Sequence, residues 1–238
     1  MGRILYIETG TNICSVAVGD NLDVISIKEN NISNAHAAQL TVYINQVLSL
    51  AGLTAKQLDA VAVSKGPGSY TGLRIGVSAA KGICYAADIP LIAVESLDSM
   101  VYGVISQKQD FLYSNSITII CPMIDARRME VYTALYYPNH NRYSDTEALI
   151  ISQDSFNELL SKNNILFFGN GSEKCKSLLI NQNAFFLENF FPSAQFMIPL
   201  ANKAYHEHIF EDIAYFEPYY LKDFVATKAR NKVINESE

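Results

Sequence analysis

Near the start of the chain, apolar residues alternate with residues of other types in three short segments. The segments span Arg3–Glu8, Cys14–Val18 and Val24–Lys28. Between them lie Thr9-Gly10-Thr11-Asn12 and Gly19-Asp20-Asn21, which are residue types that favour tight turns. This alternation predicts three consecutive strands joined by hairpins, so we expect the chain to open with an antiparallel meander.

Helical periodicity follows the third strand and then alternates with single strands. Apolar spacings of three and four predict a helix that begins near Ser33 and ends at Ala51, where Gly52 supplies the stop. The pattern then predicts a strand at 60–64, a helix at 71–87, a strand at 91–94 and a helix at 96–107. This order predicts an α/β protein with a mixed sheet.

A shorter version of the same order begins near residue 108. It contains strands at 117–124 and 129–136, a helix at 152–161, a strand at 165–168 and a helix that begins near Pro192. Both halves open with an apolar strand that ends in an acid, Glu8 or Asp125, followed by a turn and a second strand. This similarity indicates an internal duplication, with domains at 1–107 and 108–238. No linker rich in Pro, Gly or Ser divides them, so we expect one packed unit.

Composition restricts the class of protein. Charged residues are 18% of the chain, below the roughly 25% that is usual, and hydrophobic residues are 49%, which excludes a disordered chain. The net charge of −6 argues against a protein that binds RNA by itself. No segment has the roughly 18 apolar residues of a membrane span. The four cysteines are far apart and suit the reduced core of a cytoplasmic protein.

Two predicted helices explain part of the low fraction of charged residues. From Asn30 to Ala55 no residue is charged if His36 is neutral. The side of this helix away from its core face carries Ala35, Ala38, Val42, Asn45 and Ser49. The next helix carries a row of mostly small residues, which are Gly72, Gly76, Ala79, Ile83 and Ala86. Interface cores are depleted in charge, and small residues allow helices to approach closely.

These two rows predict a partner interface, with Gly76→Arg expected to block pairing and leave the fold intact. The alternative is that the second half of the chain covers both helices, and composition does not distinguish the two interpretations.

The segment Gly66-Pro67-Gly68-Ser69 follows a strand and opens a helix, where free N–H groups attract anions. It lacks the Lys of a Walker A loop, and Thr71 stands where a dinucleotide fingerprint has its third glycine. A tight turn is the alternative interpretation. The candidate nucleotide or anion site consists of Glu8, Thr9, Thr11 and Ser69. We predict no catalytic residue and no metal site, since His206-Glu207-His208 lacks the second histidine of HExxH.

Several ordered motifs resemble the TsaB (YeaZ) family along nearly the whole chain. The matching segments are Ile7-Glu8-Thr9, His36, Ala62–Gly76, Ile89–Leu97, Ile124–Tyr132 and Pro218-Tyr219-Tyr220-Leu221. Glu8 stands where the family more often has Asp, and Met129 where Gly is common. The resemblance implies an actin-like/ASKHA fold of two RNase-H-like lobes with mixed sheets. It also implies a role as partner subunit in the bacterial synthesis of threonylcarbamoyladenosine in tRNA.

The family pairs through its first two helices with TsaD, the catalytic subunit that transfers the threonylcarbamoyl group. TsaD-like chains carry paired metal-binding histidines, but Val94–Met100 contains none, so metal and catalysis are not carried over. We therefore expect a non-catalytic scaffold or activator subunit that is cytoplasmic, has no membrane contact and reaches tRNA through the complex. The ATPase TsaE is a further implied partner.

Three other hypotheses remain open from the sequence. The chain could be an ASKHA-class ATP-binding hydrolase or kinase that uses Glu8, Thr9 and Asp125, a glycopeptidase-like protease, or a homodimeric binding module. No cofactor is firmly implied, and the sequence leaves open whether a nucleotide binds at the subunit boundary or whether the isolated chain forms a homodimer.

Overall fold

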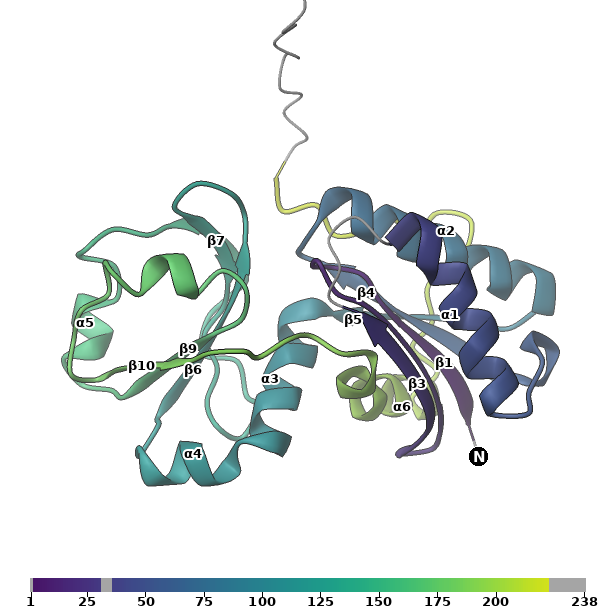
Figure 1. Ribbon diagram of the computed structural model, residues 1–238, viewed down its shortest axis with the longest axis horizontal. Helices are drawn as coiled ribbons and strands as arrows, with labels where there is room; N and C mark the ends of the chain where they lie inside the picture. The colour runs from purple at the N-terminus through teal and green to yellow at the C-terminus, as the bar shows by residue number, and fades with distance from the viewer. Residues whose placement is uncertain (1, 31–35, 223–238) are drawn as a thin grey trace, which may run out of the picture.

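The computed structural model describes residues 2–30 and 36–222, which form two lobes that each contain a five-stranded sheet (Figure 1). The first sheet has the order β3-β2-β1-β4-β5. Its strands are β1 (Arg3–Glu8), β2 (Cys14–Asp20), β3 (Asp23–Asn30), β4 (Ala60–Gly66) and β5 (Leu91–Glu95). The first three strands pair antiparallel, while β4 pairs parallel to β1 and to β5. The opening meander and the mixed sheet are therefore confirmed.

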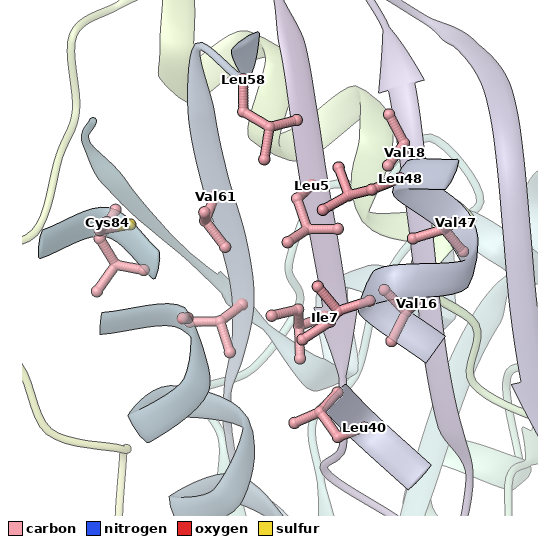
Figure 2. Packing of buried hydrophobic residues seen from close by; sticks show 14 of the residues in the cluster. Leu5, Ile7, Val16, Val18, Leu40, Val47, Leu48, Leu58, Val61 and Cys84 are labelled. Atoms are coloured by element: carbon pink, nitrogen blue, oxygen red, sulfur yellow. The ribbon is translucent and has the colours of Figure 1, made fainter. Parts of the chain in front are cut away.

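Two long helices, α1 (His36–Leu50) and α2 (Tyr70–Ala87), lie side by side on one face of this sheet, with the short 3-10 helix η1 (Ala55–Gln57) between them in the chain (Figure 1). Leucine and valine side chains of α1 point onto those of β1 and β2, as Figure 2 shows. Helix α2 begins where the Ser69 side chain accepts a hydrogen bond from the Gly72 amide at 3.2 Å. It ends at Asp88, whose φ of 55° is left-handed. The predicted start near Ser33 lies outside the described residues.

The second sheet repeats the strand order of the first. Its order is β10-β9-β6-β7-β8, so in both sheets the first strand pairs with the second and fourth. The strands are β6 (Ile119–Asp125), β7 (Glu130–Thr133), β8 (Glu147–Ile150), β9 (Ile165–Phe168) and β10 (Ala184–Leu187). The helices that lie between these strands in the chain are short, and they are α4 (Gln109–Ser114), α5 (Asn157–Leu160) and η2 (Glu173–Cys175). The predicted helix at 152–161 is thus reduced to α5, and the repeated order supports the predicted duplication.

The two lobes exchange covering helices. Helix α3 (Ser96–Gln107) follows β5, yet Met100 and Val104 are buried in the core of the second lobe. In return, η3 (Ala194–Met197) and α6 (Ile198–His206) cover the face of the first sheet opposite to α1 and α2 (Figure 1). The boundary expected near residue 107 therefore separates the two sheets but not the helices that cover them. No helix in the described part of the chain is long and apolar enough to cross a membrane.

An ion-pair network, which we call the interlobe clasp, joins the lobes beside α3. It consists of Lys65, Glu95, Asp98, Tyr136 and Arg142. The Arg142 guanidinium, from the second lobe, donates to Asp98 Oδ1 at 2.7 Å and also pairs with Glu95. Lys65 lies 3.2 Å from the same Glu95 carboxylate, and the Tyr136 hydroxyl donates to Asp98 at 2.7 Å. The clasp therefore holds the end of β5 and the start of α3 against the second sheet.

Residues 211–222 form an extended strap along one flank of α2. The Lys81 ammonium donates to the backbone carbonyls of Ala214 and Phe216, at 3.1 Å each. Near the other end of α2, the Tyr219 amide donates to the Lys65 carbonyl at 2.7 Å. The second half of the chain thus covers one flank of α2, as the alternative interpretation of the sequence expected, but it leaves the outer face of α1 exposed.

Candidate partner-binding surface

The outer face of α1 is exposed and carries no charge. The helix contains no Asp, Glu, Lys or Arg. Its exposed residues are Ala37, Ala38, Thr41, Val42, Asn45, Gln46, Ser49 and Leu50. Val42 is 47% exposed and Leu50 is 64% exposed, whereas Leu40 and Val47 on the opposite face are buried. Covering this face would bury apolar area without removing a charged group from water, which is the costly step in forming an interface.

A second exposed stripe runs along α2 beside it. Its residues are Thr71, Arg74, Ser78, Gly82 and Tyr85. Arg74 is the one charged residue in this stripe, and its guanidinium lies 4.6 Å from the centre of the Tyr70 ring. Tyr85 is 85% exposed, and tyrosine is a residue type that frequently anchors interfaces. We call the exposed residues of α1 and α2 together the α1–α2 surface.

The structure corrects part of the predicted interface. Gly72 and Gly76 are buried, and a Cβ added at Gly76 would lie 2.2 Å from Thr9 Oγ1. Gly76 therefore allows α2 to approach its own sheet, and Gly76→Arg would disrupt the fold rather than only block pairing. Ala79 and Ile83 are half-buried against the first core.

Three of the remaining predicted interface residues lie on α1. Ala38, Val42 and Asn45 are exposed, and Ala35 lies outside the described residues. The predicted set did not include Leu50 and Tyr85, which are also exposed on these helices. Helical spacing contains a signal for both, since Leu50 follows Val42 by eight residues and Tyr85 follows Ser78 by seven.

The predicted nucleotide or anion residues surround the turn between β1 and β2, but most of them are covered. Glu8, Thr9 and Thr11 are 1%, 0% and 4% exposed. The Ser69 amide donates to the Gly10 carbonyl at 2.7 Å, and a Cβ added at Gly68 would lie 2.1 Å from that carbonyl oxygen. The loop at 66–69 therefore packs directly on the turn.

Several polar atoms of this set also make hydrogen bonds within the chain. Glu8 Oε1 accepts from the Gly10 amide at 2.6 Å, and Thr11 Oγ1 accepts from the Ile13 amide at 3.2 Å. Ser69 Oγ caps α2. The residues thus come together as a sealed turn, and they present few groups to which a nucleotide phosphate could bind.

Glu8 is the unusual member of this turn because its carboxyl group is buried. Burial raises its pKa to about 7, although the Gly10 amide and the Ser64 hydroxyl act in the opposite direction. Oε2 has no hydrogen-bond partner among the described residues. A carboxyl group in such surroundings is close to half protonated at neutral pH.

Within residues 2–30 and 36–222, no group of three or more His, Cys, Asp or Glu side chains is placed to hold a metal ion. Burial raises the pKa of Cys14 and Cys84 to about 11 and that of Cys121 to about 12. These thiols stay protonated at neutral pH and are poor nucleophiles.

The repeated strand order and the two-lobed arrangement define the class of fold, which is actin-like (ASKHA) with two RNase-H-like lobes. The model of the TsaD family, tRNA N6-adenosine threonylcarbamoyltransferase, matches residues 27–230. The tRNA threonylcarbamoyladenosine biosynthesis protein TsaB of Escherichia coli K12 is 29% identical over 95% of this chain and 97% of its own length.

Two further matches extend over most of the chain. TsaB of Buchnera aphidicola subsp. Schizaphis graminum is 30% identical, over 82% of this chain and 91% of its own length. The structure of YeaZ from Pseudomonas aeruginosa superimposes with a TM-score of 0.77 at 23% identity, over 93% of this chain and all of that one. The chain belongs to the TsaB (YeaZ) family, as its motifs indicated.

Proposed function

We propose that this protein is a non-catalytic subunit in the synthesis of threonylcarbamoyladenosine in tRNA, and that it acts by pairing with a TsaD-type catalytic subunit through the α1–α2 surface. The observation that carries the proposal is the uncharged, exposed outer face of α1. The names of the relatives support the pathway, since they are tRNA threonylcarbamoyladenosine biosynthesis proteins.

The match to the TsaD family model supports the kind of partner. A TsaD-type chain of the same fold would carry two helices equivalent to α1 and α2 on its own first lobe. Pairing of these helices with α1 and α2 would bury equivalent surfaces of the two subunits against each other, in a pseudo-symmetric arrangement. We further propose that the ATPase TsaE joins this pair, that tRNA is reached through the complex, and that the complex works in the cytoplasm.

The closed β1–β2 turn supports a subunit that has no catalytic site of its own. An enzyme that transfers a group from a nucleotide needs open donors and, commonly, a metal ion near the phosphates. Here Glu8, Thr9 and Thr11 are covered, and Gly68 occupies the space above the turn. The closed turn serves to hold α2 in place on the sheet.

The test is a charge placed on the proposed interface. Val42→Arg should weaken pairing with the catalytic subunit at least 100-fold in analytical ultracentrifugation, because it buries an unpaired charge. Ile25→Arg is the matched control, since Ile25 is 43% exposed and belongs to β3 rather than to α1. Thermal unfolding of both variants should match that of the wild type. Normal pairing by Val42→Arg would contradict the proposed surface.

A transfer assay tests the non-catalytic role. Threonylcarbamoyl transfer to tRNA should require both subunits and should be lost with Val42→Arg. Transfer by this chain alone, or full activity of the catalytic subunit without it, would refute the proposal. Tight binding and turnover of Mg-ATP by the isolated chain, lost on Glu8→Gln, would favour the hydrolase or kinase instead.

The same surface favours self-association as a second candidate. Because α1 carries no charge, two copies can face each other without repulsion between like charges. Ultracentrifugation of the isolated chain, with and without the catalytic subunit, distinguishes the cases. If the catalytic subunit leaves a self-dimer intact, the homodimeric binding module is the better description.

A further inference from the structure

The turn between β6 and β7 places two arginines in an unfavourable backbone conformation. Arg127 has a φ of 70° and Arg128 a φ of 50°, both in the left-handed region. Turns that require this conformation at successive positions normally use Asn, Asp or Gly, because a larger L-residue is strained there. The Asp125 carboxylate holds the turn by accepting from the Arg127 amide at 3.0 Å. Strained residues that persist on a surface commonly serve a function.

Positive charge gathers around this turn. Arg127 and Arg128 are exposed. Lys174 pairs with Asp125 and donates to the Glu130 carbonyl at 2.7 Å, and Lys222 pairs with the Glu130 carboxylate. The two carboxylates are thus already paired with the two lysines. Neither arginine makes an ion pair within residues 2–30 and 36–222. The turn is therefore locally positive, although the net charge of the chain is −6.

The strand that follows this turn, β7, carries the aromatic residue Tyr132. Tyr132 of β7 is half-buried. Burial raises its pKa, while the charges of Lys222 and Arg127 act in the opposite direction. Guanidinium groups bind phosphate through two parallel hydrogen bonds, and aromatic rings stack on unpaired bases. An acidic protein surface would use the charges of this turn but not the ring.

The corresponding turn of the first lobe is sealed, whereas this one is open. In the first lobe Gly68 covers the turn. In the second lobe the equivalent loop contacts Asp125 from the side, since the Asn170 side chain accepts from the Asp125 amide at 3.1 Å. Arg127 and Arg128 therefore remain accessible at the tip of the hairpin.

We propose that Arg127 and Arg128, which Lys174 and Lys222 leave free by pairing with the two carboxylates, form a phosphate-binding site for the backbone of an RNA substrate. The identity of that RNA as tRNA rests on the proposed function. The phosphate chemistry rests only on the turn itself. The site would add a direct contact between this subunit and the RNA, and its contribution would fall as salt increases.

The test replaces both arginines with glycine. Arg127→Gly/Arg128→Gly removes the charges and also relieves the backbone, so thermal stability should be unchanged or higher. The matched control is Arg3→Ala/Lys56→Ala, which removes two exposed cations of the first lobe. Affinity for tRNA is measured between 50 and 200 mM salt with the full chain, alone and with the catalytic subunit. ATP serves as a second probe.

The glycine variant should bind tRNA about tenfold more weakly, with the slope of log affinity against log salt reduced by about 1 to 2. The control should bind like the wild type, and Arg127→Lys/Arg128→Lys should lose only part of the affinity because the charge remains. An unchanged tRNA affinity and slope in a folded glycine variant would overturn the proposal. Loss of ATP affinity with unchanged tRNA affinity would overturn the assignment to RNA in favour of a nucleotide phosphate.

Failure of the proposed function gives a different result. The chain would then not pair with the catalytic subunit, while the arginine-dependent affinity of the isolated chain for tRNA at low salt would persist.

Discussion

The two lobes share one strand order but treat the acid at their first hairpin in opposite ways. Glu8, at the end of β1, is 1% exposed, whereas the Asp125 side chain, at the end of β6, is 43% exposed. Each acid accepts a hydrogen bond from the amide two residues further on, so the local turn is the same. Asp125 then pairs with Lys174, while burial raises the pKa of Glu8.

The difference follows from what comes after the fourth strand of each lobe. In the first lobe β4 leads into the 18-residue helix α2, whose start brings Gly68 onto the turn. In the second lobe β9 leads only into the three-residue helix η2. A long helix therefore seals one turn and presents an exposed face, and a short one leaves the other turn open. One topology thus provides a structural turn in one lobe and an accessible charged turn in the other.

The largest expected effect comes from breaking the seal of the first lobe. Gly68→Ala should destabilise the protein by about 3 kcal/mol or more, because the new Cβ would lie 2.1 Å from the backbone oxygen of Gly10. Gly171→Ala, at the equivalent loop of the second lobe, should cost less, about 1–2 kcal/mol, since its nearest atom is at 2.9 Å. Urea denaturation measures both. Equal losses would show that the two turns are sealed alike.

Gly82→Ala is the control for these glycine substitutions. A Cβ at Gly82 meets nothing within 4 Å, and the residue lies inside α2. The variant should therefore be more stable by about 0.5–1 kcal/mol, because alanine favours the helix.

The next largest effect is a dependence of stability on pH that the buried acid of the first lobe supplies. The pKa of Glu8 is raised from 4.5 to about 7, so the folded protein binds this proton more tightly than the unfolded chain does. The contribution is fully present below pH 4.5, is lost as pH rises to about 7, and is on the order of 3 kcal/mol. Glu8→Gln should remove this dependence. A variant with the same pH profile as the wild type would contradict the account of the sealed turn.

A smaller effect is expected when the connection between the lobes is cut. Arg142→Met keeps the aliphatic stem but removes the charge that pairs with Glu95 and Asp98. Stability should fall by about 1 kcal/mol at low salt, and by less at high salt, because all three side chains are partly exposed. Lys162→Met, which breaks only the exposed pair with Glu158, is the control and should have no measurable effect. Equal behaviour of the two variants would show that the interlobe clasp adds nothing.

The smallest expected effect concerns Asp125, the exposed acid of the second lobe. Asp125→Asn breaks the pair with Lys174 at an exposed position, so stability should change by only about 0.5 kcal/mol, screened by salt. Urea denaturation at low and high salt checks this value. A loss as large as the pH effect at Glu8 would mean that the second turn is also part of the core.

Elements with clear local signals could be predicted from the sequence. The bounds of α3 and β9 agree with the expected helix at 96–107 and the strand at 165–168, because each is a single apolar pattern between strong turn signals. The strand expected at 129–136 is shorter, since only Glu130–Thr133 is in β7.

The candidate interface could be predicted on α1 but not on α2. Helix α1 has one apolar and one uncharged polar face, so Ala38, Val42 and Asn45 could be placed outward. Helix α2 has two rows of small and apolar residues, and spacing alone does not decide which row meets its own sheet. Gly76 faces Thr9 because the sheet approaches there, a tertiary contact that no local pattern contains.

The exchange of helices has a consequence for how the chain folds during synthesis. All strands of the first sheet have been synthesised by residue 95, but the helices η3 and α6 that cover one of its faces begin only at residue 194. Until then Ile4, Tyr6 and Ile92 on that face have no covering layer. The N-terminal half therefore cannot finish folding as an independent domain during translation, and an apolar surface remains available to chaperones for about a hundred further residues.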